Sequence, residues 1–285
     1  MPCRSLRTVL LCSALAMLAA CNLTQLAYNR LDTIARWRVG QYVTFDPAQR
    51  QTFDAGFRAF WAWNRQTQLP RYASALREIA ARVDQPPDTN ELGQWSDRYG
   101  ALWSASLEPL LPLACTLGTS LSDAQVARLL KQVDSDIVDY ADENVEPSLA
   151  ARREHSRRKI DKNLHRWLGS VTPEQDKLLR TWEDARAADV APQWLAFRQR
   201  WRAELATTLA ARHTQDFCPR LEALVRDGDT LWTPDQQQLF ADNRRHWTRL
   251  LVRLGASLSA EQQAHLRQLL LALADDLQTL SRTPP

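Results

Sequence analysis

The sequence predicts an all-α fold, an irregular antiparallel bundle of about nine or ten helices. Only eight glycines occur among 285 residues, and apolar residues recur every three or four positions, which is the period of an amphipathic helix. No stretch shows the alternation of apolar and polar residues that is typical of strands. A helix-start pattern also recurs along the chain. These observations favour helices joined by tight turns.

The first twenty residues have the three parts of a secretory signal. Arg4 and Arg7 precede a short apolar run, and two alanines precede Cys21. The run is shorter than the roughly 20 apolar residues that a transmembrane helix needs. The segment LAAC resembles the lipobox of bacterial lipoproteins, in which residues 1–20 would be removed and the cysteine would receive a diacylglycerol. An ordinary signal peptide that happens to be followed by a cysteine is the alternative.

Cys21 is therefore the predicted site of lipid attachment, and the membrane is the predicted partner through that anchor. The usual acylation of the new amino group would make the anchor stable, because two or more acyl chains hold a protein firmly. Asn22 follows the cysteine where Asp would retain the protein at the inner membrane. By resemblance to that sorting rule, we expect the periplasmic face of the outer membrane. The covalent lipid is the only cofactor expected.

Loss of residues 1–20 would leave a nearly neutral protein. The net charge falls from +3 to +1 because Arg4 and Arg7 are the only charged residues in the segment. Such a balance gives no reason to expect nucleic acid as a partner.

The cysteines divide in the same way. Cys3 and Cys12 belong to the signal and Cys21 carries the lipid, so that Cys115 and Cys218 remain. Because the periplasm is oxidising, we expect a disulfide between these two residues. Two separate buried thiols are the alternative.

The recurring pattern is an apolar residue, then Asp, Ser or Thr, then two residues, then Gln. In such a capping box the first polar side chain accepts a bond from the amide three residues later, and the Gln accepts one from the amide of the first residue. The predicted caps are Asp46, Ser122, Thr172, Thr233 and Ser259, with Gln49, Gln125, Gln175, Gln236 and Gln262 as return partners. The copies are unevenly spaced, which favours a bundle with recurring capped corners over a solenoid of fixed period.

The remaining elements follow from apolar stripes with helical spacing. Such stripes run through residues 23–37, 57–64, 72–80, 126–140 and 194–209. Proline-containing segments at 84–90 and 107–115 must interrupt helices. We expect residues 21–285 to form one domain, with 84–90 as the place where an amino-terminal helical pair would separate from the rest.

An acidic run over 134–146 and a basic run over 152–166 flank Pro147. We interpret them as pairing with each other across a helix corner, each surface pair contributing about 0–1 kcal/mol. Binding of lipid or an anionic polymer by the basic run is an alternative. Binding of a metal by the acidic run is another, although the spacing lacks the glycine of a calcium-binding EF-hand loop. No metal ligand is assigned.

The usual catalytic signatures are missing from the sequence. It contains no GxSxG, no phosphate-binding loop, no GxGxxG, no HExxH and no CxxC, and its five histidines are scattered. No catalytic residue is assigned, and enzymatic activity is not expected.

Three segments, LAYNRLDTIARW, WNRQTQLPRYASAL and RWLGSVTPEQ, together with the lipobox, resemble a family of Gram-negative helical lipoproteins known only as a domain of unknown function. The resemblance implies a helical envelope lipoprotein and supplies no reaction or substrate. Members of that family commonly carry His where Asn64 stands here. The cap patterns are also similar to the LTxxQ marks of small periplasmic stress chaperones, and capping boxes explain each copy without common ancestry.

The predicted function is therefore that of a non-enzymatic outer-membrane lipoprotein, a scaffold or interaction module with an envelope protein as its partner. A periplasmic chaperone or stress protein is the first alternative. An enzyme that modifies cell wall or lipid is the second.

Overall fold

The computed structural model describes residue 28, residue 30 and residues 33–282; the signal segment and Cys21 lie outside this part. No strand occurs in the described chain, and the all-α prediction is confirmed. None of its helices is both long and apolar enough to cross a membrane. A helix over 33–42 is followed by α2 (Pro47–Trp63), α3 (Leu69–Ala80), α4 (Thr89–Leu107), α5 (Leu111–Ser120), α6 (Asp123–Asn144), α7 (Leu149–Leu168), α8 (Pro173–Ala185), α9 (Val190–Ala210), α10 (Phe217–Arg226), α11 (Pro234–Ala256) and α12 (Ala260–Arg282).

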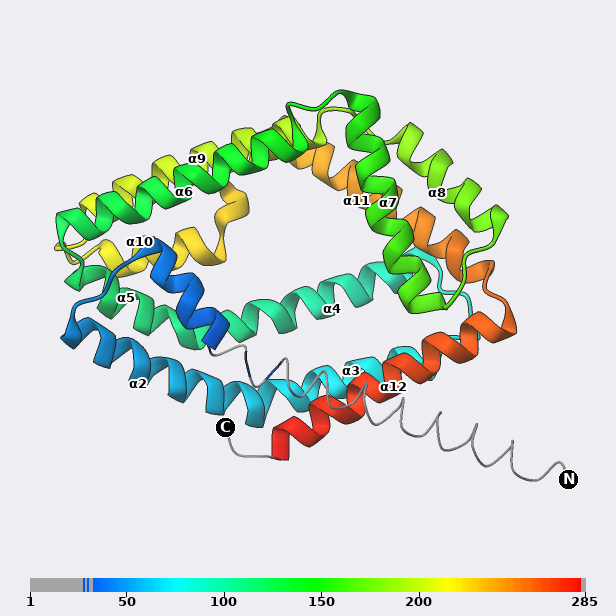
Figure 1. Cartoon of the computed structure of the whole chain (residues 1–285), viewed down its shortest axis with the longest axis horizontal. Helices are drawn as coiled ribbons and strands as arrows, with labels where there is room; N and C mark the ends of the chain where they lie inside the picture. Colours follow the sequence, from blue (N-terminus) through cyan, green and yellow to red (C-terminus); the bar gives the residue numbers. More distant parts are fainter. Residues whose placement is uncertain (1–27, 29, 31–32, 283–285) are drawn as a thin grey trace, which may run out of the picture.

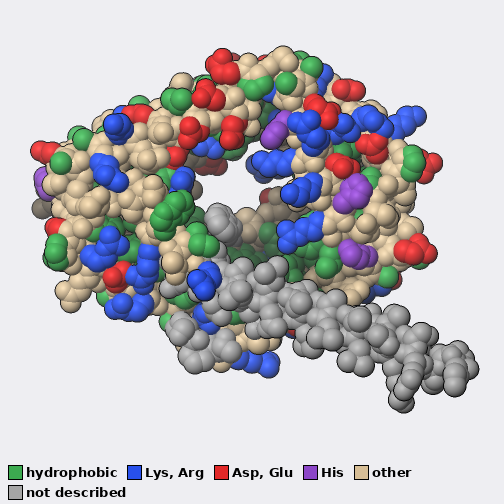
Figure 2. Space-filling model, viewed as in Figure 1, with side chains coloured by type: hydrophobic (Ala, Val, Ile, Leu, Met, Phe, Trp, Pro, Cys, Tyr) green, Lys and Arg blue, Asp and Glu red, His purple; other side chains and the backbone are tan. Residues whose placement is uncertain are grey.

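The helices form an elongated ring of antiparallel pairs (Figure 1). α6 and α9 pack along one long side, and α3 and α12 pack along the other. α7, α8 and α11 pack together at one end, whereas α5 and α10 lie at the other. Figure 2 shows an opening through the molecule inside this ring. The expected bundle thus encloses space at its centre.

All five capping boxes are formed in the structure. In each, the side chain of the cap accepts a hydrogen bond from the amide of the Gln, and the Gln Oε1 accepts one from the amide of the cap. The caps are Asp46, Ser122, Thr172, Thr233 and Ser259. Prolines 47, 173 and 234 occupy the first helical position of their helices, where the missing amide proton costs no helical hydrogen bond.

Four of the five return glutamines also bind one another in pairs, each pair joining two helix starts at one end of the ring. Gln49 Nε2 donates to Gln125 Oε1 at 3.1 Å, and Gln125 Nε2 donates back to Gln49 Oε1 at 2.6 Å. Each side-chain amide also donates to a backbone carbonyl two residues before the cap of the other helix. Gln49 donates to Ser120 and Gln125 donates to Thr44, both at 2.8 Å. This pair joins the start of α2 to the start of α6.

A second pair repeats the arrangement at the opposite end of the ring (Figure 1). Gln175 and Gln262 exchange two amide hydrogen bonds of 2.9 Å. Gln175 Nε2 donates to the Ser257 carbonyl at 3.2 Å, and Gln262 Nε2 donates to the Ser170 carbonyl at 2.9 Å. Both side chains are buried, so this pair ties the start of α8 to the start of α12 out of contact with water.

The fifth return glutamine finds a different partner. Gln236 Nε2 donates to the backbone carbonyl and to Oε1 of Gln193, both at 2.9 Å. Gln193 lies near the start of α9 and belongs to no capping box. A glutamine contact therefore joins the starts of α9 and α11.

A π-helical turn, Asn64–Gln68, connects α2 to α3 without a break. Pro70 follows in the first turn of α3 and has no amide proton to donate to the preceding turn, which favours a wider turn at this point. The turn buries the polar side chains Asn64, Arg65 and Gln68.

Among the described residues, the apolar core forms three clusters. One joins Phe217 of α10 to residues of α9 and of the turns before α2 and α6. The second packs Leu179 and Trp182 of α8 against α11, and the third packs Phe53 and Phe57 of α2 against α5. A ring has no single interior, so each pair of helices buries its own apolar faces.

Candidate functional site

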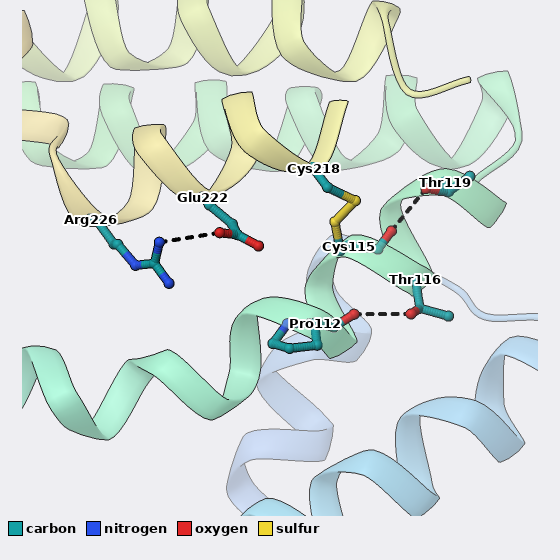
Figure 3. The surroundings of a disulfide bond; sticks show 7 residues. All are labelled: Pro112, Cys115, Thr116, Thr119, Cys218, Glu222 and Arg226. Carbon is teal, nitrogen blue, oxygen red and sulfur yellow. Dashed lines mark hydrogen bonds and ion pairs between the residues drawn. A yellow bond between two sulfur atoms is a disulfide. The ribbon is translucent and has the colours of Figure 1, made fainter. Parts of the chain in front are cut away.

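Cys115 and Cys218 lie in α5 and α10, and the structure joins them by a disulfide with Cα atoms 5.4 Å apart (Figure 3). The bond closes a separation of 103 residues. Gly118 lies one turn from Cys115, and a Cβ atom on it would stand 2.5 Å from Cζ of Phe217. Glycine there permits the close approach of α5 and α10 that brings the sulfur atoms together.

Asn64 is a buried hydrogen-bond acceptor. Tyr28 donates its hydroxyl proton to Asn64 Oδ1 at 2.9 Å, and the Arg65 guanidinium lies 5.2 Å from the centre of the Tyr28 ring. Burial raises the pKa of Tyr28 to about 12, against the opposing effect of the Arg65 charge. Tyr28 therefore stays protonated at ordinary pH and holds Asn64 in place.

The π-helical turn also contacts α4. The hydroxyl groups of Tyr72 and Ser106 lie 2.5 Å apart, and Ser106 Oγ donates to Gln68 Oε1 at 3.5 Å. Gln68 and Ser106 are buried. These contacts fasten the α2–α3 connection to α4, so the simplest role of this cluster is structural.

The two charged runs do not pair with each other in the described chain, and that interpretation is wrong. In the acidic run, Asp134 pairs with Arg202 of α9 at 2.6 Å and Asp136 pairs with Arg38 at 3.4 Å. A hydrogen bond from Arg202 lowers the pKa of Asp134. In the basic run, Arg157 pairs with Glu154 at 2.8 Å. α6 packs along α9, which gives Asp134 a partner there, and the two charged runs come near each other only where α6 ends and α7 begins, at Glu143 and Asn144.

A small cavity of about 150 Å³ lies where α6 and α8 end and α7 and α9 begin. We call it the basic corner. Its polar lining consists of Asn144, Arg152, Arg153, His155, Ser156, Lys159 and Arg186, with Glu143 and Glu183 as the acidic members. Cations therefore outnumber carboxylates there.

The cations of the basic corner are engaged to different degrees. Arg152 donates to the Asn144 carbonyl at 3.4 Å and Arg153 donates to the Asp184 carbonyl at 2.9 Å, so both satisfy helix ends while keeping their positive charge. Arg186 is paired with the buried Glu183 at 3.3 Å. Lys159 is exposed and makes no ion pair with any described residue.

A larger groove of about 440 Å³ lies between α4, α7, α11 and α12. We call it the tryptophan groove, because Trp95, Trp167 and Trp247 enter it from three different helices. Leu164, Leu251 and Leu266 are further members of an almost entirely apolar lining. Its size lies in the range of about 300–1,000 Å³ that is usual for ligand sites.

Both the groove and the basic corner are lined in part by α7. Lys159 lines the corner, and the next residue, Ile160, lines the groove. Figure 2 shows Lys and Arg side chains along the α7 edge of the central opening. Sequence analysis missed this site because the three tryptophans are more than seventy residues apart along the chain, and no local pattern connects them.

The structure offers no evident metal site in its described part. No group of three or more His, Cys, Asp or Glu residues lies close enough there to hold a metal ion.

Comparison with known proteins gives a family and no reaction. No curated protein and no solved structure matches the chain. A family model described as a family of unknown function, DUF6279, matches residues 41–237. These residues make up more than half of the chain and contain the capped starts of α2, α6, α8 and α11. The chain belongs to the DUF6279 family of unknown function.

Proposed function

We propose that this protein is a lipid-anchored lipoprotein at the periplasmic face of the Gram-negative outer membrane, and that it acts by binding a ligand rather than by catalysis. The observation that carries the binding role is the tryptophan groove. Large aromatic side chains contribute much contact area at such sites, and an apolar group that leaves water gains about 25 cal/mol for each Å² buried.

The proposed localisation rests on the amino-terminal sequence. The signal-like segment, the LAAC lipobox and Asn22 all support export and attachment of lipid at Cys21. The disulfide between Cys115 and Cys218 supports the same localisation, because such bonds persist in oxidising compartments such as the periplasm.

Metabolic labelling with palmitate tests the anchor. The full chain should incorporate label and fractionate with outer membranes, and Cys21→Ser should abolish both. Cys12→Ser is the matched control, since Cys12 lies within the segment that would be removed; it should leave both unchanged. Labelling of Cys21→Ser at the level of the unsubstituted chain would overturn the anchor.

Binding of the neutral apolar dye N-phenylnaphthylamine tests the groove. Asn163 is exposed at the groove and Lys177 is exposed on α8 outside it. We expect Asn163→Trp to fill the groove and abolish the saturable dye fluorescence, whereas Lys177→Trp should preserve it. Equal fluorescence from both variants would contradict the binding role.

A further inference from the structure

We propose that the ligand is a long-chain fatty acid, with its carboxylate in the basic corner and its hydrocarbon chain in the tryptophan groove. This inference rests on the proposed function, because it takes the groove as the binding site and names the chemistry of its occupant. The two cavities are lined by the same helix, α7, and two consecutive residues of that helix belong one to each lining, Lys159 to the corner and Ile160 to the groove. One ligand that bridges them must be anionic at one end and apolar along the rest.

The charge of the basic corner suits a carboxylate. Arg152 and Arg153 keep their positive charge because they bind backbone carbonyls. Glu183 is already paired with Arg186, which leaves Glu143 as the opposing carboxylate in the lining. Lys159 stands at the boundary with the groove and has no ion-pair partner in the described chain. An acid whose chain lies in the groove would place its head beside this ammonium group.

The length of the groove along α7 suits one acyl chain. Lys159 and Leu168 are nine positions apart on the helix, and a rise of about 1.5 Å per residue gives roughly 14 Å between them. An acyl chain spans about half of the roughly 30 Å hydrocarbon core of a bilayer, which is about 15 Å. A chain that starts at Lys159 would therefore reach the end of the groove.

The size of the two cavities favours a single-chain acid over a membrane phospholipid. The groove, at about 440 Å³, lies in the lower part of the range for ligand pockets. The corner, at about 150 Å³, has room for a small head. A phospholipid would bring a second chain and a larger head, for which the site offers no further apolar volume in its lining.

Photolabelling with matched probes tests this inference. The protein as isolated from cells is placed in phosphatidylcholine nanodiscs and irradiated with a long-chain fatty acid that carries a diazirine at the far end of its chain. The corresponding fatty alcohol and fatty amine are the comparison probes. We expect the acid to label peptides that line the groove, and to do so at least fivefold more than the amine.

Two substitutions, with a third as their control, separate the contribution of the Lys159 charge from that of the apolar groove. Lys159→Glu should lower labelling by the acid about tenfold, the factor that corresponds to a 1.4 kcal/mol change in binding, while labelling by the alcohol changes less than twofold. Lys177→Glu reverses an exposed charge on α8 outside both cavities and should change neither. Asn163→Trp should lower labelling by all three probes.

The outcomes are distinguishable. Labelling by the acid that Lys159→Glu leaves unchanged, or labelling by the amine equal to that by the acid, would overturn the inference. If N-phenylnaphthylamine still binds in the groove under those outcomes, the proposed binding role survives and only the identity of the ligand falls. If Asn163→Trp does not fold, the comparison of acid with alcohol in Lys159→Glu still decides the question.

Discussion

The buried pair formed by Gln175 and Gln262 offers the sharpest test of how the ring is held together. Gln175→Ala removes the acceptor of the Thr172 amide and the donor to the Ser257 carbonyl, and it leaves Gln262 without the two bonds of 2.9 Å that the amides exchange. The side chains of Gln175 and Gln262 are 0% and 2% exposed, so water cannot replace the lost bonds without entering the corner.

The expected cost follows from the groups left without partners. A buried polar group without a hydrogen bond costs about 1–3 kcal/mol. The buried Gln262 amide loses both bonds that it exchanged with Gln175, and the half-buried Thr172 amide loses its acceptor, so we expect Gln175→Ala to lower the free energy of unfolding by about 3–5 kcal/mol. For a chain of this length, each kcal/mol lowers Tm by roughly 2–4 °C.

Urea denaturation followed by circular dichroism measures this change. Gln262→Ala should cost a similar amount, and the double variant should cost about 1–3 kcal/mol less than the sum of the two, because the second substitution removes a group that the first has already left unpaired. Gln238→Ala is the control, since Gln238 is exposed on α11, and it should change stability by less than about 0.5 kcal/mol. A loss below about 1 kcal/mol for Gln175→Ala would refute the reasoning.

Three further predictions concern other parts of the ring. Replacement of Cys115 and Cys218 by Ser should lower the free energy of unfolding by about 4–5 kcal/mol, the chain-entropy value for a loop of this size. Reductant should destabilise the unsubstituted protein and leave the double variant unaffected. An intact mass that does not change on reduction and alkylation would exclude the bond. Gly118→Ala should destabilise the fold by about 1–3 kcal/mol, because the new Cβ meets Phe217. Gly100→Ala in α4 is the control: nothing lies within 4 Å of its Cβ, and it should stabilise the fold by about 0.5–1 kcal/mol. Equal shifts in Tm for the two variants would contradict the close packing at Gly118. An ultraviolet titration should show a phenol that ionises near pH 12, and this transition should be missing in Tyr28→Phe. The pKa of Tyr28 in the folded protein lies above its ordinary value of 10.0, so the folded protein retains a proton that the unfolded chain loses. The free energy of unfolding should therefore fall as pH rises from about 10 to 12. A Tyr28→Phe difference spectrum centred near pH 10 would contradict the burial.

The helices were predictable because their signals are local. A capping box needs only residues three apart, and Thr172 with Gln175 marks the start of α8 in the sequence as it does in the structure. The choice of partner for each Gln was not predictable in the same way. Gln175 and Gln262 lie 87 positions apart, and no local pattern distinguishes that pairing from one with Gln125.

The tryptophan groove was hidden for the same reason. It brings together Trp95, Trp167 and Trp247, and their meeting depends on the closure of the ring. The interpretation of the charged runs failed because proximity in sequence suggested contact across Pro147. The packing of α6 on α9 instead gives Asp134 its partner, Arg202.

The packing of α3 against α12 affects the order of folding. α3 ends at Ala80 and α12 begins at Ala260, so the apolar face of α3 packs against a helix almost two hundred residues further along the chain. Contacts between such distant segments form slowly, because the entropy of a large loop must be lost before they form. A chain made from its amino terminus onward therefore cannot complete its ring until its last helix emerges. The truncation of α12 should then act as a folding defect of the amino-terminal half.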